Sequence, residues 1–199
     1  MIDKCEIYTL NVMKNKLLNP FRYMPIRQAT CWGLVALILS AVLCWQAGLR
    51  ITSLTQINFA GDALWVATAR QVIVWVLFSL VLYAAGVIFS KSKVRFQDVA
   101  AFNLFARIPF DISLLIFLFP QVRSVMGLLM DNSLNTALQY MNLLTIVGLV
   151  SSVLCVWYMV WSYMAFSEAT NLKGGRGVAI FAVAWIISYL GSPFLLMWA

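Results

Sequence analysis

The sequence predicts an all-α fold: a polytopic membrane helical bundle of five transmembrane helices, with its N-terminus in the cytoplasm and its C-terminus outside. Of the 199 residues, 63% are hydrophobic and 11% are charged, whereas a soluble domain averages about 45–50% and about 25%. The apolar residues form five runs, each near the ~20 residues that cross a bilayer. Basic residues lie in alternate loops between these runs. The length suits one bundle without a separate soluble domain.

Residues 1–28 are expected to form a cytoplasmic amphipathic segment ahead of the transmembrane domain, residues 29–199. Apolar residues recur there at helical spacing with lysines between them, as in a helix that lies on a membrane surface. Asn19 and Pro20 end the predicted helix, because proline disfavours a helical conformation of the residue before it. The alternative interpretation is a disordered basic tail.

The five spans are predicted at residues 29–49, 64–89, 99–119, 140–166 and 178–198. Trp32 and Trp45 lie near the two ends of the first span, where interfacial aromatic residues gather. Pro109 interrupts the third span and predicts a kink near its centre. The partly polar stretch 121–139 is expected to hold a short interfacial helix.

The distribution of basic residues predicts the orientation. With the N-terminus inside, the inner segments carry 10 of the 14 basic residues and the outer loops carry only Arg50 and Arg123, as the positive-inside rule requires. Arg70 and Arg107 lie within spans. The inner basic residues expected to contact anionic lipid headgroups or a partner are Lys14, Lys16, Arg22, Arg27, Lys91, Lys93, Arg95, Lys173 and Arg176.

The composition excludes several classes of chemistry. The chain has four cysteines without a CxxC pair and no histidine, so histidine-based acid–base catalysis and Ser-His-Asp triads are excluded. A zinc site or a disulfide framework is not expected either. We therefore predict a non-enzymatic protein with no catalytic residues, no metal and no cofactor. The net charge of +7 lies in short loops beside spans, which argues against nucleic-acid binding.

The third span carries the most informative polar residues. Asn103, Arg107 and Asp111 are four residues apart, so they line one face of a helix. An isolated charge at this depth costs at least about 2.5–3.5 kcal/mol, which a mutual ion pair reduces. Pro109 lies between the two charges and frees a backbone carbonyl. These four residues are either a functional mid-membrane polar site or a structural ion pair that fixes helix packing.

Small residues recur four apart in the last two spans. Gly148 and Ser152 form one such step, Ser151 and Cys155 form a second, and Ala184, Ser188 and Ser192 form a third. Steps of this kind let membrane helices approach closely. We interpret all three as packing faces rather than as functional sites.

Three stretches of the chain resemble proteins of the bacterial YIP family: LLNPFRYMPIRQ, KVRFQDVAAFNLFARIPFDI and WYMVWSYMAFSEATNLKGGRGVAIFAVAW. The positions that carry the second likeness are Arg95, Phe96, Ala106 and Pro109. The resemblance implies five spans, a cytoplasmic N-terminus and a bacterial inner-membrane location. Eukaryotic members interact with Rab-type GTPases, but their Asp-Leu-Tyr-Gly-Pro element and Gly-Tyr pair are missing here, which argues against a GTPase partner.

Two functional hypotheses remain open at this point. The first is a membrane-organising or partner-binding scaffold that uses its basic cytoplasmic face, with the bilayer, anionic headgroups, a membrane protein or a second copy as partner. The second is a small transporter, channel or lipid-handling protein built around Arg107 and Asp111. Both place the chain as a multi-pass protein of a membrane.

Overall fold

A computed structural model describes residues 19–130 and 138–197, and the chain is almost entirely helical there. The predicted amphipathic helix ahead of residue 19 lies outside the described residues. In chain order the elements are η1 Pro20–Arg22, α2 Ile26–Ala47, β1 Arg50–Ile51, β2 Ile57–Asn58, α3 Leu64–Phe89, α4 Phe96–Ala106, α5 Ile108–Leu114, η2 Leu115–Leu118, α6 Pro120–Met130, α8 Met141–Thr170 and α9 Gly174–Leu196.

Five helical segments are long and apolar enough to cross a membrane, which confirms the predicted all-α bundle and its number of spans in the described part of the chain. The spans are α2, α3, the combined segment α4–α5–η2, α8 and α9. The largest differences from prediction are the later end of α8, at Thr170, and the earlier start of α9, at Gly174. A helix satisfies its own backbone hydrogen bonds, so it continues past the point where the apolar run ends.

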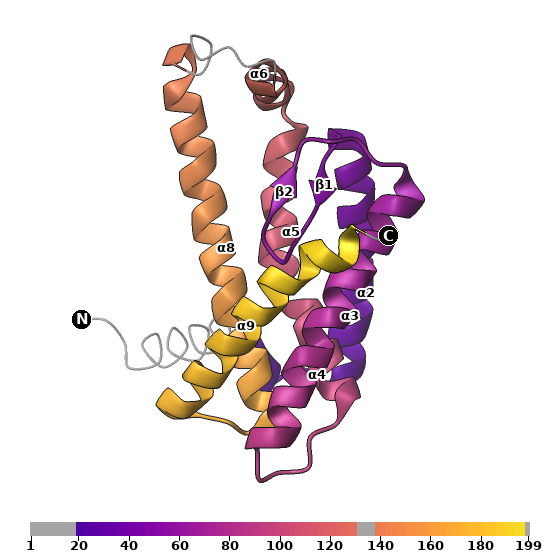
Figure 1. The fold of residues 1–199 in the computed structure, drawn as a ribbon, viewed down its shortest axis with the longest axis vertical. Coiled ribbons are helices and arrows are strands. Elements are labelled where there is room, and N and C mark those ends of the chain that lie inside the picture. The colour runs from indigo at the N-terminus through magenta and orange to yellow at the C-terminus, as the bar shows by residue number, and fades with distance from the viewer. Residues whose placement is uncertain (1–18, 131–137, 198–199) are drawn as a thin grey trace, which may run out of the picture.

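The third span is the centre of the bundle. Of its most apolar stretch, 72% of residues are buried, against 11% to 33% in the other four spans. Helices α2, α3 and α8 all pack against α4, and α2 and α8 also pack against α5. Figure 1 shows α4 and α5 enclosed by these helices, with α9 crossing obliquely over α3. Any polar group on the third span is therefore surrounded by protein.

The third span is broken at Arg107, where α4 ends and α5 begins. Pro109 lies in the first turn of α5, where its missing N–H is tolerated. The proline cannot donate to the carbonyl four residues earlier, and its ring clashes with that carbonyl. The predicted interruption near Pro109 is confirmed, and it lies at Arg107, two residues before the proline.

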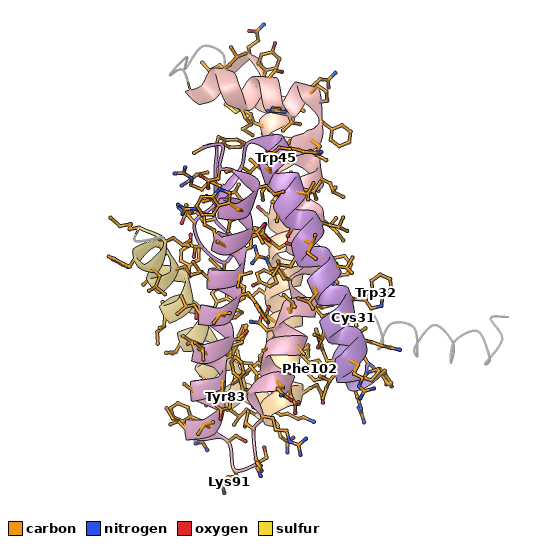
Figure 2. The ribbon with its side chains drawn as sticks, turned by 90° about the vertical axis from the view of Figure 1, so that its right-hand side faces the viewer. Cys31, Trp32, Trp45, Tyr83, Lys91 and Phe102 are labelled. Atoms are coloured by element: carbon orange, nitrogen blue, oxygen red, sulfur yellow. The ribbon has the colours of Figure 1, made fainter. Side chains whose placement is uncertain are left out.

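Helices α2 and α4 approach each other closely at Gly33. A Cβ atom placed on Gly33 would lie 2.7 Å from Cγ of Leu104 and 3.1 Å from the Leu104 carbonyl carbon. Trp32 and Trp45, in contrast, are 60% and 50% exposed, and Figure 2 shows both on the outer side of α2. One face of α2 thus packs against the third span, and the opposite face is exposed to lipid.

The end of the bundle predicted to lie outside carries a small β-hairpin and a short helix. Gly48, with φ of 69°, ends α2 in the left-handed conformation that glycine adopts without strain. The chain then forms the antiparallel pair β1–β2, which the sequence did not predict. Helix α6 occupies the first part of 121–139, so the predicted short helix is confirmed there.

The opposite end, predicted to be cytoplasmic, is closed by η1. The Phe21 ring is 3% exposed, and its centroid lies 5.5 Å from that of Phe102, 5.9 Å from Phe105 and 6.1 Å from Trp161. Phe102 is directed into the bundle near this end (Figure 2). The segment η1 is thereby anchored to the third and fourth spans.

The predicted small-residue faces have different outcomes. Ala184, Ser188 and Ser192 are 3%, 0% and 0% exposed, so this face of α9 does pack. On α8, Ser151 and Cys155 are half-buried and Cys155 packs against the core. Gly148 and Ser152 are exposed, and a Cβ on Gly148 would meet nothing within 4 Å, so the packing step predicted at these two residues is wrong. Small residues permit close approach only where a second helix is present, and the first half of α8 lies at the edge of the bundle (Figure 1).

The contact at Gly33 predicts a position-specific loss of stability. Gly33→Ala should destabilise the protein by about 1–3 kcal/mol, because the added methyl group overlaps Leu104 and neither helix backbone can easily shift. Thermal unfolding of the detergent-solubilised protein measures this loss. Gly148→Ala is the matched control, since the same methyl group enters open space; equal melting temperatures for the two variants would contradict the close packing.

Five spans and the positive-inside rule together predict the location of the C-terminus. With the basic loops in the cytoplasm, an odd number of spans places the C-terminus on the other side. Alkaline phosphatase fused to the C-terminus should therefore be active in a bacterial host, and green fluorescent protein fused there should remain dark. The reverse pattern would overturn the orientation while leaving the number of spans intact.

Candidate functional site

The two charges of the third span form a buried ion pair. Nε of Arg107 lies 3.3 Å from Oδ1 of Asp111, and the residues are 3% and 7% exposed. The pairing follows from their spacing of four residues, which places both on one face, and the N–H of Asp111 donates to the carbonyl oxygen of Arg107 over 3.1 Å. The predicted proximity of these residues is therefore confirmed, whereas their functional role is a separate question.

Asn103, the third predicted member, has a different partner. Its Nδ2 donates to Oγ of Ser79 over 3.1 Å, and both residues are buried. This hydrogen bond joins α4 to α3 one turn away from the ion pair. Asn103 therefore contributes to helix packing rather than to the surroundings of the two charges.

Sequence reasoning missed three polar neighbours supplied by the first two spans. Oγ of Ser40 donates to Oε1 of Gln71 over 2.6 Å, and Nε2 of Gln71 lies 3.7 Å from Sγ of Cys44. All three residues are 0–1% exposed, and Ser40 lies beside the carboxylate of Asp111. The signal was present in the sequence, because Gln71 is an uncharged polar residue inside a largely apolar run.

Aromatic rings close the remaining side of this polar cluster. The Arg107 guanidinium carbon lies 5.4 Å from the centroid of the Phe110 ring, within the range of a cation–π interaction. Phe110 in turn packs on Tyr158 of α8, with 5.9 Å between centroids, and both residues are no more than 2% exposed. The two charges are thus enclosed by α2, α3 and α8.

This arrangement is suited to fixing helices rather than to admitting a ligand. A charge pair in a low-dielectric interior offsets part of its desolvation cost, and removal of one partner leaves the other uncompensated. Every wall of the cluster consists of buried side chains. The structure therefore favours the interpretation of Arg107 and Asp111 as a structural ion pair.

The basic residues of the inner end are placed unequally. Lys91, Lys173 and Arg176 line one pocket of about 320 Å³, which we name the inner pocket. Its other lining residues are Phe89, Ser90, Ser92, Asn171 and Leu172. Lys93 and Arg95 are exposed in the same α3–α4 loop and do not line this pocket.

The remaining predicted inner residues are not part of this pocket. Arg22 and Arg27 are exposed near the start of α2. Lys14 and Lys16 lie outside the described residues. Three of the nine basic residues predicted to contact headgroups or a partner therefore line one pocket. Their spacing in the sequence did not indicate this grouping, because it depends on how the helices fold together.

Hydrogen bonds hold the two loops of the inner pocket together. The hydroxyl oxygens of Ser90 and Ser92 lie 2.6 Å and 3.0 Å from the carbonyl oxygen of Thr170, to which both donate. Gly86 allows this contact, because a Cβ there would lie 2.7 Å from Cγ2 of Thr170. The α3–α4 loop, which carries Lys91 at the end of the molecule (Figure 2), is thus tied to the end of α8.

The turn between α8 and α9 and the start of α9 place Lys173 and Arg176 at the inner pocket. Asn171, with φ of 57°, ends α8 in the left-handed conformation that asparagine tolerates better than most residues. Lys173 is the N-cap of α9, and Gly174 follows with φ of 72°. The first turn of a helix presents unpaired N–H groups and a partial positive charge, which adds to the field of the three cations.

No protein-family model, curated protein or solved structure matches this chain. The resemblance to the bacterial YIP family therefore stays a prediction from the sequence.

The enclosed ion pair predicts strong coupling between its members. Arg107→Leu alone and Asp111→Leu alone should each destabilise the protein by about 3–5 kcal/mol, because each leaves one buried charge without a partner. The double variant should lose less stability than the sum of the two. Unfolding measurements on the four proteins of this cycle give the coupling.

Arg123→Leu is the control for loss of an arginine, since Arg123 is exposed on α6. It should leave stability nearly unchanged. Strictly additive losses at Arg107 and Asp111, with no coupling, would show that the two residues do not act as a pair.

Proposed function

We propose that this chain is a non-enzymatic integral membrane protein that binds anionic lipid headgroups on its basic inner face and so organises the surrounding membrane. The observation that carries the proposal is the convergence of Lys91, Lys173 and Arg176 on the inner pocket. Lys91 comes from the α3–α4 loop, whereas Lys173 and Arg176 come from the start of α9. A binding surface assembled in this way selects for a ligand of opposite charge.

The charge of the inner pocket supports this proposal. Its lining holds three cations and no carboxylate among the described residues. A basic residue near a membrane surface that contains anionic lipid contributes about 1 kcal/mol of attraction. The attraction extends about 8–10 Å at physiological salt, so residues gathered in one pocket act together on one headgroup.

The shape of the inner pocket supports a lipid rather than a soluble anion. Phe89 and Leu172 form an apolar part beside the three cations and the hydroxyl and amide groups of the two loops. Phe89 is the last residue of α3, so the pocket lies where the membrane span ends. The charged headgroup of a lipid would contact the cations, and its glycerol and first methylene groups would contact Phe89 and Leu172.

Of the two hypotheses from the sequence, the membrane-organising or partner-binding scaffold is therefore better supported than the transporter, channel or lipid-handling protein. A transporter or channel at Arg107 and Asp111 requires access to the pair, and both side chains are enclosed in buried packing. The proposal that the chain is a YIP-family-like scaffold of the bacterial cytoplasmic membrane rests on the sequence resemblance. A membrane-protein partner or a second copy would use the same inner face.

Photocrosslinking to lipid tests the proposal. In proteoliposomes that contain a diazirine-bearing phosphatidylglycerol, label should be recovered on peptides of the α3–α4 loop and the α8–α9 turn. The triple variant Lys91→Gln, Lys173→Gln and Arg176→Gln should reduce this labelling by about tenfold or more, since each lost cation removes about 1 kcal/mol. High salt should weaken the wild-type signal.

Lys93→Gln is the matched control, because Lys93 is exposed in the same loop as Lys91 and does not line the inner pocket. It should reduce labelling less than Lys91→Gln does. The proposal is overturned if a diazirine-bearing phosphatidylcholine labels the same peptides equally well, or if Lys93→Gln and Lys91→Gln have equal effects.

A further inference from the structure

A second cluster of charges lies at the opposite, outer end of the bundle. Nε of Arg50 lies 3.0 Å from each carboxylate oxygen of Asp62, and its Nη2 lies 2.5 Å from Oδ1. Nε of Arg70 lies 3.2 Å from Oδ2 of the same carboxylate. The Asp62 side chain is only 6% exposed, so one nearly buried carboxylate holds two arginines. We name this group the outer arginine cluster.

Four separate parts of the fold assemble this cluster. Arg50 belongs to β1, Asp62 lies between β2 and α3, and Arg70 lies on α3. Nη1 of Arg70 donates to the carbonyl oxygen of Leu196 over 3.4 Å, which brings the end of α9 to the same place. Figure 1 shows the end of α9 near the hairpin, as these contacts require.

The outer arginine cluster is not electrically balanced. One carboxylate faces two guanidinium groups, so one net positive charge remains. The hydrogen bonds use Nε and Nη2 of Arg50 and Nη1 of Arg70, whereas Nε of Arg70 forms only the ion contact with Asp62. Nη1 of Arg50 and Nη2 of Arg70 have no hydrogen-bond acceptor among the described residues. Two oriented donor groups therefore remain after Asp62 has fixed both side chains.

These arginines line a pocket of about 340 Å³, which we name the outer pocket. Thr52 and Asn58 of the hairpin contribute a hydroxyl and an amide to its wall, and the end of α9 contributes apolar surface through Pro193, Leu196 and Met197. Arg70 lies six residues into α3, which is about 9 Å along the helix axis. That depth is the level of lipid headgroups and the first acyl carbons.

We propose that the outer pocket binds a phosphate group, with the two arginines as its main ligands. A guanidinium group presents donors in a planar fork that matches the oxygens of a phosphate, and it does so best when its orientation is fixed beforehand. Asp62 fixes both guanidinium groups here. The amide of Asn58 supplies a further donor at the wall of the pocket.

A cluster that only tied the hairpin to α3 would not require this composition. One arginine already neutralises Asp62, and the second adds a charge at the edge of the membrane that costs free energy to bury. Binding of an anion accounts for the second arginine, for the unused donors and for the mixed polar and apolar wall. The phosphate comes either from a phospholipid of the outer leaflet or from solution, and the experiment separates these sources.

The test is native mass spectrometry of the detergent-solubilised full chain with dioleoyl phosphatidylglycerol. It is run on the variant with Lys91→Gln, Lys173→Gln and Arg176→Gln, so that lipid at the inner pocket does not contribute. Phosphatidylglycerol should bind at least about tenfold more tightly than dioleoylglycerol, which has the same chains without the phosphate, because hydrogen bonds to charged groups are among the strongest in proteins. Excess inorganic phosphate displaces the lipid if free phosphate also fits the site.

Asn58→Asp separates binding from folding. Asn58 is exposed and lies outside the outer arginine cluster, and the new carboxylate removes the net positive charge of the pocket. This variant should lose phosphatidylglycerol binding while its melting temperature stays near that of the parent. Gln56→Glu is the control, because it adds the same charge to the same hairpin at an exposed residue that does not line the pocket.

The outcomes decide the proposal in every case. Selective loss in Asn58→Asp, without displacement by inorganic phosphate, identifies a phospholipid site; the same loss with displacement identifies a general phosphate site. Equal binding of phosphatidylglycerol and dioleoylglycerol overturns the proposal, and so do equal effects of Asn58→Asp and Gln56→Glu. Because the inner pocket is neutralised throughout, either result is independent of the function proposed for that pocket.

Discussion

Arg107 and Asp111 cannot face lipid, and this constraint determines where the third span lies. Each charge exposed to the middle of a bilayer costs at least about 2.5–3.5 kcal/mol, so both must turn toward protein. Their pairing at 3.3 Å satisfies part of that requirement, and enclosure by the first, second and fourth spans satisfies the rest. The third span has the lowest mean hydropathy of the five spans and is also the most buried of them. The four more apolar spans lie around it.

The rest of the packing follows from placing a charged, proline-broken helix at the centre. The first two spans supply Ser40, Gln71 and Ser79 at the positions that face it, and each of these residues is fully buried. Gly33 lets α2 approach α4 closely enough to exclude lipid from the interior. Aromatic rings from α5 and α8 cover the remaining side. Each neighbour thus presents a polar or small residue to the third span and an apolar face to the membrane.

Hydropathy and proline were sufficient to predict the five spans and the break at Pro109, because both depend on local composition and backbone chemistry. The pairing of Arg107 with Asp111 was predictable from helical spacing for the same reason. The partners Gln71 and Ser40 were not, since they depend on which face of each span turns inward. Gly148 was assigned to a packing face in error, because a small residue indicates that close approach is possible and not that a neighbouring helix exists.

The arrangement of positive charge differs between the two ends of the bundle. Both arrangements support the proposal that ligands bind at the ends rather than at the centre. At the end predicted to be cytoplasmic, Lys91, Lys173 and Arg176 are exposed and no carboxylate lines their pocket among the described residues. At the opposite end, a nearly buried aspartate contacts two arginines, which limits the reach of their charge and restricts their geometry. At the centre, Arg107 and Asp111 form an ion pair with each other and are buried in the packing of the helices. The closed middle and the two basic pockets are the features on which we base the proposal that this bundle holds lipid at its surfaces rather than passing a solute through its core.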